Sequence, residues 1–468
     1  MRRTKIVATI GPATDSPEVL EALVAAGMDV ARLNSSHSGL DELAVRLEAV
    51  RAASDRAGRP VAVMLDLAGP KLRLGEVADG TVLRTGADFT IVPGDCIGGP
   101  ERVCVSYAAL SERLSAGARL LIDDGAIELV VTGTEHGAVH TRVEAGGPIS
   151  SRKGINAPGA TLGLDAVTER DREVLAWGLE VGVDLVAQSF VRSAADVRHL
   201  RELMSGRDVP IVAKIERHEA VADIVGIVAE SDVVMVARGD LGVETSPEEV
   251  PVLQRRVISV CRDQGVPVIV ATQMLESMTS TTRPTRAEAS DVANAIFDEV
   301  DAVMLSAETA VGSFPLRSVQ TMARIATHAE SSLDAERPPL RSAGDTDDVT
   351  AAVSAAVCEL AGDLDLAAIV TATQSGATAR AVARHRPRAP IVAATPSPEV
   401  VRRLQVVWGV HPLLVPLADD TDLMLDSVLA AVRDAGLAPG GARVAITAGI
   451  ASRVPGATDF VLVRGIPV

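Results

Sequence analysis

The sequence predicts an α/β protein: a (β/α)8 TIM barrel with an inserted small β-barrel domain and a C-terminal α/β domain. Short apolar runs alternate with helical segments between residue 4 and about residue 330, which indicates βαβ units around a parallel sheet. The runs number eight, which is the strand count of a closed (β/α)8 barrel. A doubly wound open sheet would show the same alternation, so the count favours the barrel without excluding the alternative.

The eight runs are expected to be the barrel strands in chain order. Their spacing is regular except after the third run, where more than 100 residues precede the fourth. A separate domain is therefore expected after strand three. The runs are residues 5–10, 29–34, 61–67, 183–190, 210–216, 232–240, 267–273 and 301–309.

The inserted segment, residues 71–153, has a different pattern. Short stretches of alternating polarity are separated by Gly, Pro and Asp, which is typical of a small all-β domain. We expect it to act as a lid on the barrel, which would comprise residues 1–70 and 154–334. Residues 335–348 are polar and proline-bearing, so they are predicted to be a linker.

The remaining residues, 349–468, predict a second α/β unit with a regulatory role. Apolar runs again alternate with helical segments, here over residues 397–409 and 421–436. The expected strands are 367–373, 390–396, 411–417, 442–449 and 459–465.

Composition limits the function. Hydrophobic residues make up 47% of the chain but aromatic residues only 2%, which suits parallel sheets packed with Ala, Val, Leu and Ile. The net charge of −17, with no long basic run, argues against nucleic acid or an anionic membrane as a partner. Binding sites for small anions are compatible with this charge.

The cysteines Cys96, Cys104, Cys261 and Cys358 show no CxxC spacing, so we expect neither a zinc site nor a disulfide framework. No apolar stretch approaches the roughly 18 residues of a membrane span. The N-terminal apolar run is broken by Gly11 and Pro12, too early for a secretory signal. A reducing cytoplasm is the expected location.

Polar residues close six of the eight predicted barrel strands. The C-terminal ends of barrel strands form the active site in enzymes of this fold, so these residues are candidates for chemistry. They are Arg32, Asn34 and Ser36; Asp66; Lys214 and Glu216; Arg238 and Asp240; Thr272 and Gln273; and Ser306 and Glu308.

Their chemical types suit a small phosphorylated acid. The carboxylates of Glu216 and Asp240 can hold a Mg²⁺ that takes its other ligands from water and substrate. Lys214 lies two residues before Glu216 in an extended segment, so both side chains share one face. Arg32 supplies a planar fork for phosphate. Gly239 and Asp240 are expected just before a helix whose backbone N–H groups could receive a carboxylate.

Longer motifs give the chain a family resemblance from end to end. The order and length of "RGDLGVE" and "RPTRAEASDVANAI" make the match specific. The chain resembles the pyruvate kinase family through the motifs "ATIGP" (8–12), "RLNSSH" (32–37), "DLAGPKLR" (66–73), "KGINAPG" (153–159), "KIE" (214–216), "MVARGDLGVE" (235–244), "ATQMLESM" (271–278), "RPTRAEASDVANAI" (283–296) and "MLSAETA" (304–310).

The resemblance implies phosphoryl transfer from phosphoenolpyruvate to ADP, then protonation of the enolpyruvate. Glu216 and Asp240 would bind Mg²⁺ or Mn²⁺. Lys214 would neutralise charge on the transferred phosphoryl group, and Arg32 would hold the phosphate.

The same resemblance implies which residues bind the substrate carboxylate and which bind the nucleotide. Gly239, Asp240 and Thr272 would hold the substrate carboxylate, and Thr272 would relay a proton through water. The nucleotide contacts would be Arg73 and Lys153, with help from His37. The first two flank the insert, as expected of a lid that closes over the phosphates.

Lys71 is the main departure from the family pattern. Lysine is rare here, with only Lys5, Lys71, Lys153 and Lys214 in the whole chain. Many family members have Glu at the position of Lys71 and hold K⁺ with residues that match Asn34, Ser36, Asp66 and the carbonyl at Leu67. We expect the Lys71 ammonium to join the catalytic groups in place of K⁺ and to make the enzyme K⁺-independent.

The C-terminal loop "TATQSGATA" (371–379) follows a predicted strand and opens a helix. Thr373, Ser375, Gly376 and Thr378 would form a phosphate cradle. The resemblance implies a sugar-phosphate or nucleotide effector there, near a short loop at 448–459, and a homotetramer.

Two other functions fit part of the pattern. A Mg²⁺-dependent aldolase or lyase would use the same two carboxylates but has no use for Arg73 and Lys153. A catalytically silent metabolite sensor would not need Lys214 and Thr272. An assay of ADP-dependent pyruvate formation separates all three.

Overall fold

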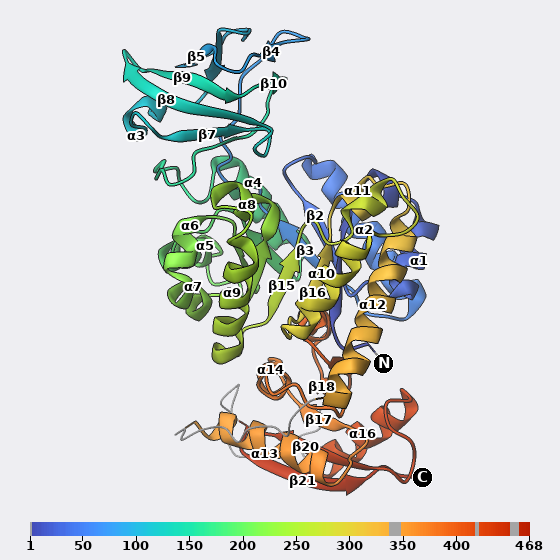
Figure 1. Cartoon of the computed structure of the whole chain (residues 1–468). Helices are drawn as coiled ribbons and strands as arrows, with labels where there is room; N and C mark the ends of the chain where they lie inside the picture. Colours follow the sequence, from blue (N-terminus) through green and yellow to red (C-terminus); the bar gives the residue numbers. More distant parts are fainter. Residues whose placement is uncertain (1, 337–347, 417–420, 450–457) are drawn as a thin grey trace.

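The computed structural model describes residues 2–336, 348–416, 421–449 and 458–468. Most of the predicted linker and of the loop at 448–459 lies outside these residues. Figure 1 shows the insert above the barrel and the C-terminal domain below it. Within the described residues no helix is both long and apolar enough to cross a membrane.

The barrel is closed and all eight predicted strands are confirmed. The ring order is β1-β16-β15-β14-β13-β12-β3-β2, and every neighbouring pair is parallel. The closed ring rules out the open doubly wound sheet. The strands are β1 (Lys5–Ile10), β2 (Val30–Asn34), β3 (Ala62–Asp66), β12 (Leu185–Gln188), β13 (Ile211–Ile215), β14 (Val233–Ala237), β15 (Val268–Ala271) and β16 (Ala302–Leu305).

Helices surround this ring and bury their apolar faces against it. Their ends follow local sequence signals: Ser16 caps α1 and Gly27 ends it with a φ of 112°, a conformation that glycine adopts readily. The helices are α1 (Pro17–Ala26), α2 (Leu40–Ala57), α4 (Glu169–Val181), α5 (Ala194–Leu203), α6 (His218–Ala222), α7 (Ile224–Glu230), α8 (Arg238–Glu244), α9 (Val250–Gln264), α10 (Arg286–Phe297), α11 (Ala307–Ala310) and α12 (Pro315–Glu336), with 3-10 turns η1 (Pro12–Thr14) and η2 (Glu276–Thr279).

The insert consists mainly of β-strands, as predicted, with one short helix, α3. Its main sheet runs β11-β7-β8-β9-β5-β6, beside a two-stranded sheet of β10 and β4. Bridges from Arg73 to Gly154 and from Leu74 to Val105 link the two edges of the main sheet. The elements are β4 (Val82–Leu83), β5 (Asp88–Pro93), β6 (Arg102–Val105), α3 (Leu110–Arg113), β7 (Arg119–Ile122), β8 (Ile127–Glu135), β9 (Ala138–Ala145), β10 (Gly147–Pro148) and β11 (Ile155–Asn156).

One expectation about the insert is wrong. Cys96 and Cys104 form a disulfide, although their spacing gave no reason to expect one. The turn between β5 and β6 folds back and brings the two Cα atoms to 5.6 Å, within the usual range for a disulfide.

The C-terminal domain confirms the five predicted strands in one sheet. Its order is β19-β18-β17-β20-β21, parallel except for β21. The elements are α13 (Val349–Asp363), β17 (Ile369–Ala372), α14 (Ala377–Ala383), β18 (Ile391–Thr395), α15 (Pro398–Arg403), η3 (Leu404–Val406), β19 (Val410–Leu414), α16 (Thr421–Asp434), β20 (Arg443–Ala448) and β21 (Phe460–Gly465).

This domain joins the barrel at the N-terminal ends of the barrel strands. The Arg386 guanidinium donates to both oxygens of Asp301, at 2.9 and 2.8 Å. The Lys5 ammonium donates to the carbonyl of Val410 at 2.7 Å. The C-terminal domain therefore lies at the opposite end of the barrel from the insert (Figure 1).

Candidate active site

The candidate residues gather at the C-terminal ends of the barrel strands, under the insert. Lys214, near the end of β13, is central, and its side chain is 10% exposed. Its ammonium lies 2.8 Å from Oε1 of Glu216 and 3.3 Å from Oδ1 of Asp66. Burial alone would lower the pKa of Lys214, but these two carboxylates raise it above its ordinary value. The side chain is therefore a fixed positive charge.

Asp66 links Lys214 to Arg32. Nε of Arg32 donates to Oδ2 of Asp66 at 2.6 Å, and a second guanidinium nitrogen donates to the hydroxyl of Thr9 at 3.1 Å. Burial would raise the pKa of Asp66, but Lys214 and Arg32 hold it below its ordinary value. Two cations, one on β2 and one on β13, are thus oriented by one buried carboxylate on β3, a strand that lies between them in the ring.

Glu216 and Asp240 form the carboxylate pair predicted to bind a metal. Burial raises the pKa of Glu216, and the charge of Asp240 adds to this rise. A divalent cation would relieve that repulsion, so the pair fits Mg²⁺. Among the described residues no three His, Cys, Asp or Glu side chains gather as a metal site, so further ligands would come from water and substrate.

Lys71, the first residue of the insert, contacts one member of this pair, Asp240. Its ammonium donates to Oδ1 of Asp240 at 3.3 Å and lies 3.6 Å from Oδ1 of Asp124 in the β7–β8 turn. Burial would lower the pKa of Lys71, but Asp240 and Asp124 raise it. Lys71 thus connects the barrel to the insert.

Thr272 and Gly239 contact each other beside Asp240. The Gly239 N–H donates to the Thr272 hydroxyl at 2.7 Å. Thr272 has a φ of 67°, a strained value for a β-branched residue, and Arg238 donates to its carbonyl at 2.7 Å. Gly239 and Asp240 lie in the first turn of α8, so the expectation that they precede the helix is wrong by one turn.

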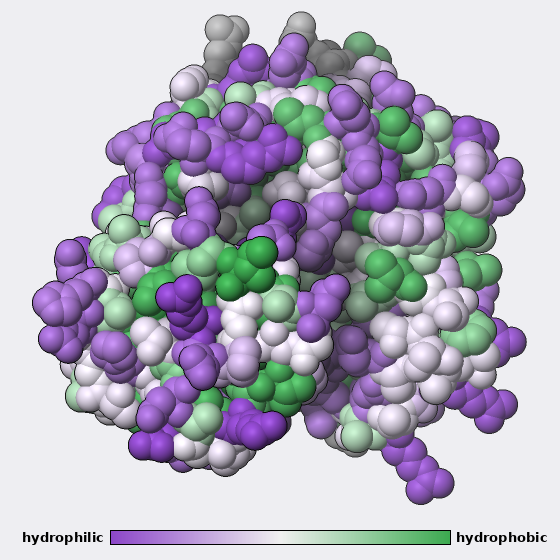
Figure 2. All heavy atoms as spheres, turned by 90° about the horizontal axis from the view of Figure 1, so that it is seen from above, coloured by the Kyte–Doolittle hydropathy of each residue, from purple (hydrophilic) through white to green (hydrophobic). Residues whose placement is uncertain are grey.

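The three nucleotide candidates lie around the entrance to the site. Arg73 donates to the carbonyl of Arg152 at 3.1 Å, and the Lys153 ammonium lies 2.8 Å from Oδ1 of Asp123. Burial, and the positive charges of Arg73, Arg32 and Lys71, lower the pKa of His37. Seen from the insert end (Figure 2), this face carries both hydrophilic and hydrophobic side chains and is hollowed near its middle.

Three of the four candidate monovalent-cation ligands, Asn34, Asp66 and the Leu67 carbonyl, already have protein partners. The Asn34 amide oxygen accepts the N–H of Ser36 at 3.1 Å, and the Leu67 carbonyl accepts the Ser189 hydroxyl at 2.7 Å. Asp66 is engaged by Lys214 and Arg32, as described above. Lys71 is paired with Asp240 rather than with these oxygens.

Ser189 is a site residue that the sequence prediction missed. Its hydroxyl accepts a hydrogen bond from the Lys214 ammonium at 2.7 Å and donates one to the Leu67 carbonyl. Next to it, Phe190 has a φ of 56° and donates its N–H to Glu216 at 2.8 Å. Ser189 directly follows β12. Polar residues at the C-terminal ends of barrel strands were the candidates on the other strands, and the same criterion would have selected Ser189.

Two other predicted strand-end residues have structural partners. The buried Glu308 carboxylate accepts the N–H groups of Leu275 and Ser306, so it stabilises the turns after β15 and β16. Arg238 is paired with Asp291 at 2.7 Å.

The predicted effector loop lies far from this site, at the start of α14. The Gly376 N–H donates to the Thr373 hydroxyl at 2.9 Å, and the hydroxyls of Thr378 and Thr458 lie 2.8 Å apart. The Ser375 hydroxyl accepts the Ala377 N–H at 3.4 Å. Residues 450–457 of the nearby loop lie outside the described part of the chain.

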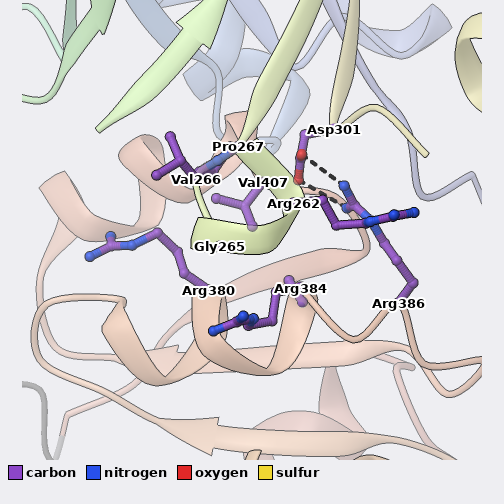
Figure 3. A pocket seen from close by; sticks show the side chains of 10 residues that line it. Arg262, Gly265, Val266, Pro267, Asp301, Arg380, Arg384, Arg386 and Val407 are labelled. Carbon is purple, nitrogen blue, oxygen red and sulfur yellow. Dashed lines mark hydrogen bonds and ion pairs between the residues drawn. The ribbon is translucent and has the colours of Figure 1, made fainter. Parts of the chain in front are cut away.

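A small cavity of about 20 Å³ lies at the other end of the barrel, against the C-terminal domain (Figure 3). Its lining includes Arg262, Arg380, Arg384 and the Arg386–Asp301 pair. None of the strand-end candidates lines it, so it is separate from the candidate active site.

The sequence matches two protein-family models. Residues 1–319 match "Pyruvate kinase, barrel domain" and residues 351–464 match "Pyruvate kinase, alpha/beta domain". The chain belongs to the pyruvate kinase family. It is therefore a phosphotransferase enzyme, and the two matched regions correspond to the barrel and to the C-terminal sheet described above.

Individual members of the pyruvate kinase family match over nearly the whole chain. A pyruvate kinase of Geobacillus stearothermophilus is 45% identical, over 99% of this chain and 80% of that protein. One of Mycobacterium intracellulare is 46% identical, over 99% and 98%. A crystal structure of a pyruvate kinase from Cryptosporidium parvum has a TM-score of 0.92 at 33% identity and covers 100% of this chain and 96% of that one.

Proposed function

We propose that the barrel mouth transfers the phosphoryl group of phosphoenolpyruvate to ADP, giving pyruvate and ATP, in the cytoplasm. The supporting observation is the Lys214 ammonium, held 2.8 Å from Glu216 and 3.3 Å from Asp66, with Arg32 on the far side of Asp66. Fixed cations around one point are what a loose phosphoryl-transfer transition state requires, because charge spreads over its three equatorial oxygens.

Glu216 and Asp240 would hold the divalent cation, Mg²⁺ or Mn²⁺. When bound, the ion would supply positive charge shared by the substrate carboxylate and phosphoryl oxygens. Arg32 and Lys214 contact the phosphate in this proposal. The burial of Lys214 strengthens its interaction with the phosphoryl oxygens, because little water screens it.

Thr272 and Gly239 would orient the acid. The Thr272 hydroxyl is held in place by two hydrogen bonds, because it accepts from the Gly239 N–H at 2.7 Å and donates to the Ala271 carbonyl at 2.6 Å. The hydroxyl would pass a proton from water to the enolate carbon after transfer.

The insert would close as a lid over the nucleotide. Arg73 and Lys153, at the two crossings between barrel and insert, would hold the ADP phosphates, with His37 beside them. His37 supports this role by its position near Arg73 and Lys71 and by its lowered pKa, which keeps it neutral at physiological pH.

Lys71 would replace the monovalent cation, so that activity does not require K⁺. Its raised pKa keeps it charged, and it already contacts Asp240. The oxygens of Asn34, Asp66 and Leu67 have internal partners, which also supports the proposal.

The C-terminal loop would bind a sugar-phosphate or nucleotide effector through Thr373, Ser375, Gly376 and Thr378, within a homotetramer. Hydroxyls at the start of α14 support this assignment by their suitability for phosphate oxygens.

The test is an assay of pyruvate formation from phosphoenolpyruvate and ADP. We expect turnover with Mg²⁺ or Mn²⁺, none with EDTA, and none without ADP. Pyruvate formation that does not depend on ADP would favour a lyase, and absence of turnover with all components present would overturn the proposal.

A further inference from the structure

The four cysteines of the chain fall into two chemically different pairs. Cys261 in α9 and Cys358 in α13 are buried free thiols. Burial raises the pKa of both thiols, that of Cys358 to about 12. Because the thiolate is the reactive form, neither thiol is suited to react at physiological pH. Thiol–disulfide exchange is therefore confined to Cys96 and Cys104.

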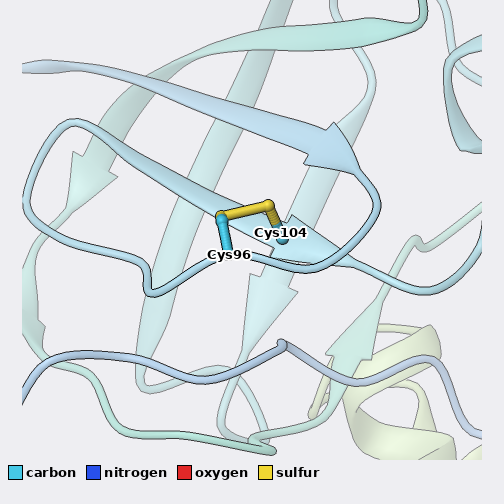
Figure 4. The surroundings of a disulfide bond; sticks show 2 residues. All are labelled: Cys96 and Cys104. Carbon is cyan, nitrogen blue, oxygen red and sulfur yellow. A yellow bond between two sulfur atoms is a disulfide. The ribbon is translucent and has the colours of Figure 1, made fainter.

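The disulfide is accessible from one side. Cys104 is in β6 and 3% exposed, whereas Cys96 is half-buried in the turn that precedes this strand (Figure 4). The adjacent Ile97 is 76% exposed. Cys96 is thus the more exposed of the two cysteines, so a dithiol would approach from its side, with the sulfur of Cys104 as the leaving group.

We propose that Cys96 and Cys104 form a reversible redox site that controls how firmly the insert holds Arg73 and Lys153. This inference rests on the proposed role of these two residues as nucleotide contacts. Disulfides in reducing compartments are usually transient and redox-sensing, which agrees with a switch rather than a permanent cross-link.

The contacts connect the disulfide to the first strand-like segment of the insert, residues 73–78. The Gly75 N–H donates to the Cys104 carbonyl at 2.7 Å. At the other end of the cross-linked turn, the Gly98 N–H donates to the Glu76 backbone carbonyl at 2.7 Å. The Gly98 carbonyl accepts the N–H of Ala78 at 3.0 Å. The disulfide therefore ties together the two places where the turn holds this segment.

Glycine at position 75 allows the close approach. A Cβ there would lie 3.0 Å from the Cys104 carbonyl oxygen, which is shorter than ordinary contact. The segment then pairs with the returning chain, since Leu74 donates to the carbonyl of Lys153 at 2.8 Å and Arg73 bridges Gly154. Loosening of the turn would thus reach both candidate nucleotide contacts.

An external dithiol reduces the Cys96–Cys104 disulfide in two exchange steps. Its first thiolate attacks the Cys96 sulfur, the bond to Cys104 breaks, and the Cys104 thiolate takes up a proton. Its second thiolate then displaces Cys96 from the mixed disulfide, and Cys96 takes up a proton in turn. Two electrons pass from the dithiol to the protein, and the reagent leaves as its own disulfide.

The experiment compares the full-length protein after equilibration with oxidised or reduced dithiothreitol. Peptide mass spectrometry measures the disulfide, and calorimetry measures the dissociation constant of ADP with Mg²⁺ present. We expect the 96–104 cross-link only in the oxidised protein, about 3- to 10-fold weaker ADP binding after reduction, and a matching rise in KM for ADP with little change in kcat.

The variant Cys96→Ser should bind ADP as the reduced protein does and lose the response to redox state, and Cys358→Ser should keep the response. A Cys96→Ser variant that still responds, absence of the cross-link in the oxidised protein, or equal ADP affinity in both states would overturn the inference. If ADP affinity responds but no pyruvate forms, the proposed reaction fails and the redox site stands.

Discussion

The ammonium of Lys71 lies 3.3 Å from Oδ1 of Asp240, across 169 residues of sequence. Lys71 opens the insert, and Asp240 lies in the first turn of α8, so one ion pair joins the insert to a candidate metal-binding carboxylate. A fixed ammonium therefore lies beside a carboxylate that we propose to hold the divalent cation.

Replacing Lys71 by glutamate should create a requirement for K⁺, because the fixed charge is then absent. We expect activity of Lys71→Glu to fall at least about 10-fold when KCl is replaced by tetramethylammonium chloride at equal ionic strength. The wild type should change less than about 2-fold. Initial rates of pyruvate formation measure both.

Lys71→Arg is the matched variant, because it keeps the charge and should remain independent of K⁺ even if its kcat is lower. Loss of wild-type turnover in tetramethylammonium chloride would contradict the proposed role of Lys71.

Ser189 should matter for catalysis through Lys214. The variant Ser189→Ala removes a 2.7 Å hydrogen bond to the ammonium and frees the Leu67 carbonyl. A hydrogen bond to a charged group contributes about 1.5–3 kcal/mol, so kcat should fall about 10- to 100-fold with a smaller change in KM.

Ser35→Ala is the control for Ser189. The Ser35 hydroxyl makes a 2.8 Å hydrogen bond to the backbone of Asp66 but does not contact Lys214. Equal losses of kcat in both variants would show that Ser189 contributes to the local structure in general and does not act through Lys214.

Asp301 should be important for the attachment of the C-terminal domain. Its two oxygens accept from Arg386 and from the N–H groups of Val268 and Trp408. Asp301→Ala leaves a buried guanidinium without this carboxylate, so the free energy of unfolding in urea should fall by about 3–5 kcal/mol.

Asp208→Ala is the comparison, since the exposed Arg403–Asp208 pair also joins the two domains. We expect no resolvable change in its unfolding midpoint. An Asp301→Ala variant as stable as Asp208→Ala would refute the importance of the Arg386 pair.

The lowered pKa of Lys5 should make the free energy of unfolding depend on pH. Burial lowers the pKa of Lys5 from 10.5 to about 8, partly offset by Asp29. Between about pH 8 and 10.5 the unfolded chain holds a proton that the folded chain has lost, so the Lys5 contribution to stability rises with pH, by up to about 3 kcal/mol. Below about pH 8 both states are protonated and the contribution is constant.

Urea unfolding of the wild type and of Lys5→Met from pH 7 to 10.5 tests this. The stability difference should shift in favour of the wild type as pH rises above 8. The adjacent His411 does not interfere, because its pKa is lowered to about 4 and it stays neutral throughout. A difference that stays constant with pH would show that the Lys5 pKa is not lowered.

The strands of the fold could be predicted from the sequence because strands that are buried on both faces appear as continuous apolar runs. Strands such as β14 and β16 are buried along their whole length and read as continuous apolar runs. Lys214 and Glu216 were predicted to share a face by their spacing in an extended strand, and they are in contact.

Contacts between distant elements could not be read in this way. The pairing of Lys71 with Asp240 depends on how the insert sits above the barrel. Cys96 and Cys104 meet because a turn folds back, and no periodic pattern encodes that turn. Ser189 was missed because it falls inside the predicted apolar run 183–190, whereas the strand ends one residue before it, at Gln188.

The most direct test of the proposed reaction is the kcat of Lys214→Met for pyruvate formation from phosphoenolpyruvate and ADP. Lys214→Arg keeps the charge but not its compact position, and Arg198→Met removes a cation from an exposed pair as a control. We expect a loss of about 10³-fold in kcat for Lys214→Met, with Mn²⁺ binding retained, and no change in kcat for Arg198→Met. Turnover of folded Lys214→Met within about 10-fold of the wild type would contradict this expectation.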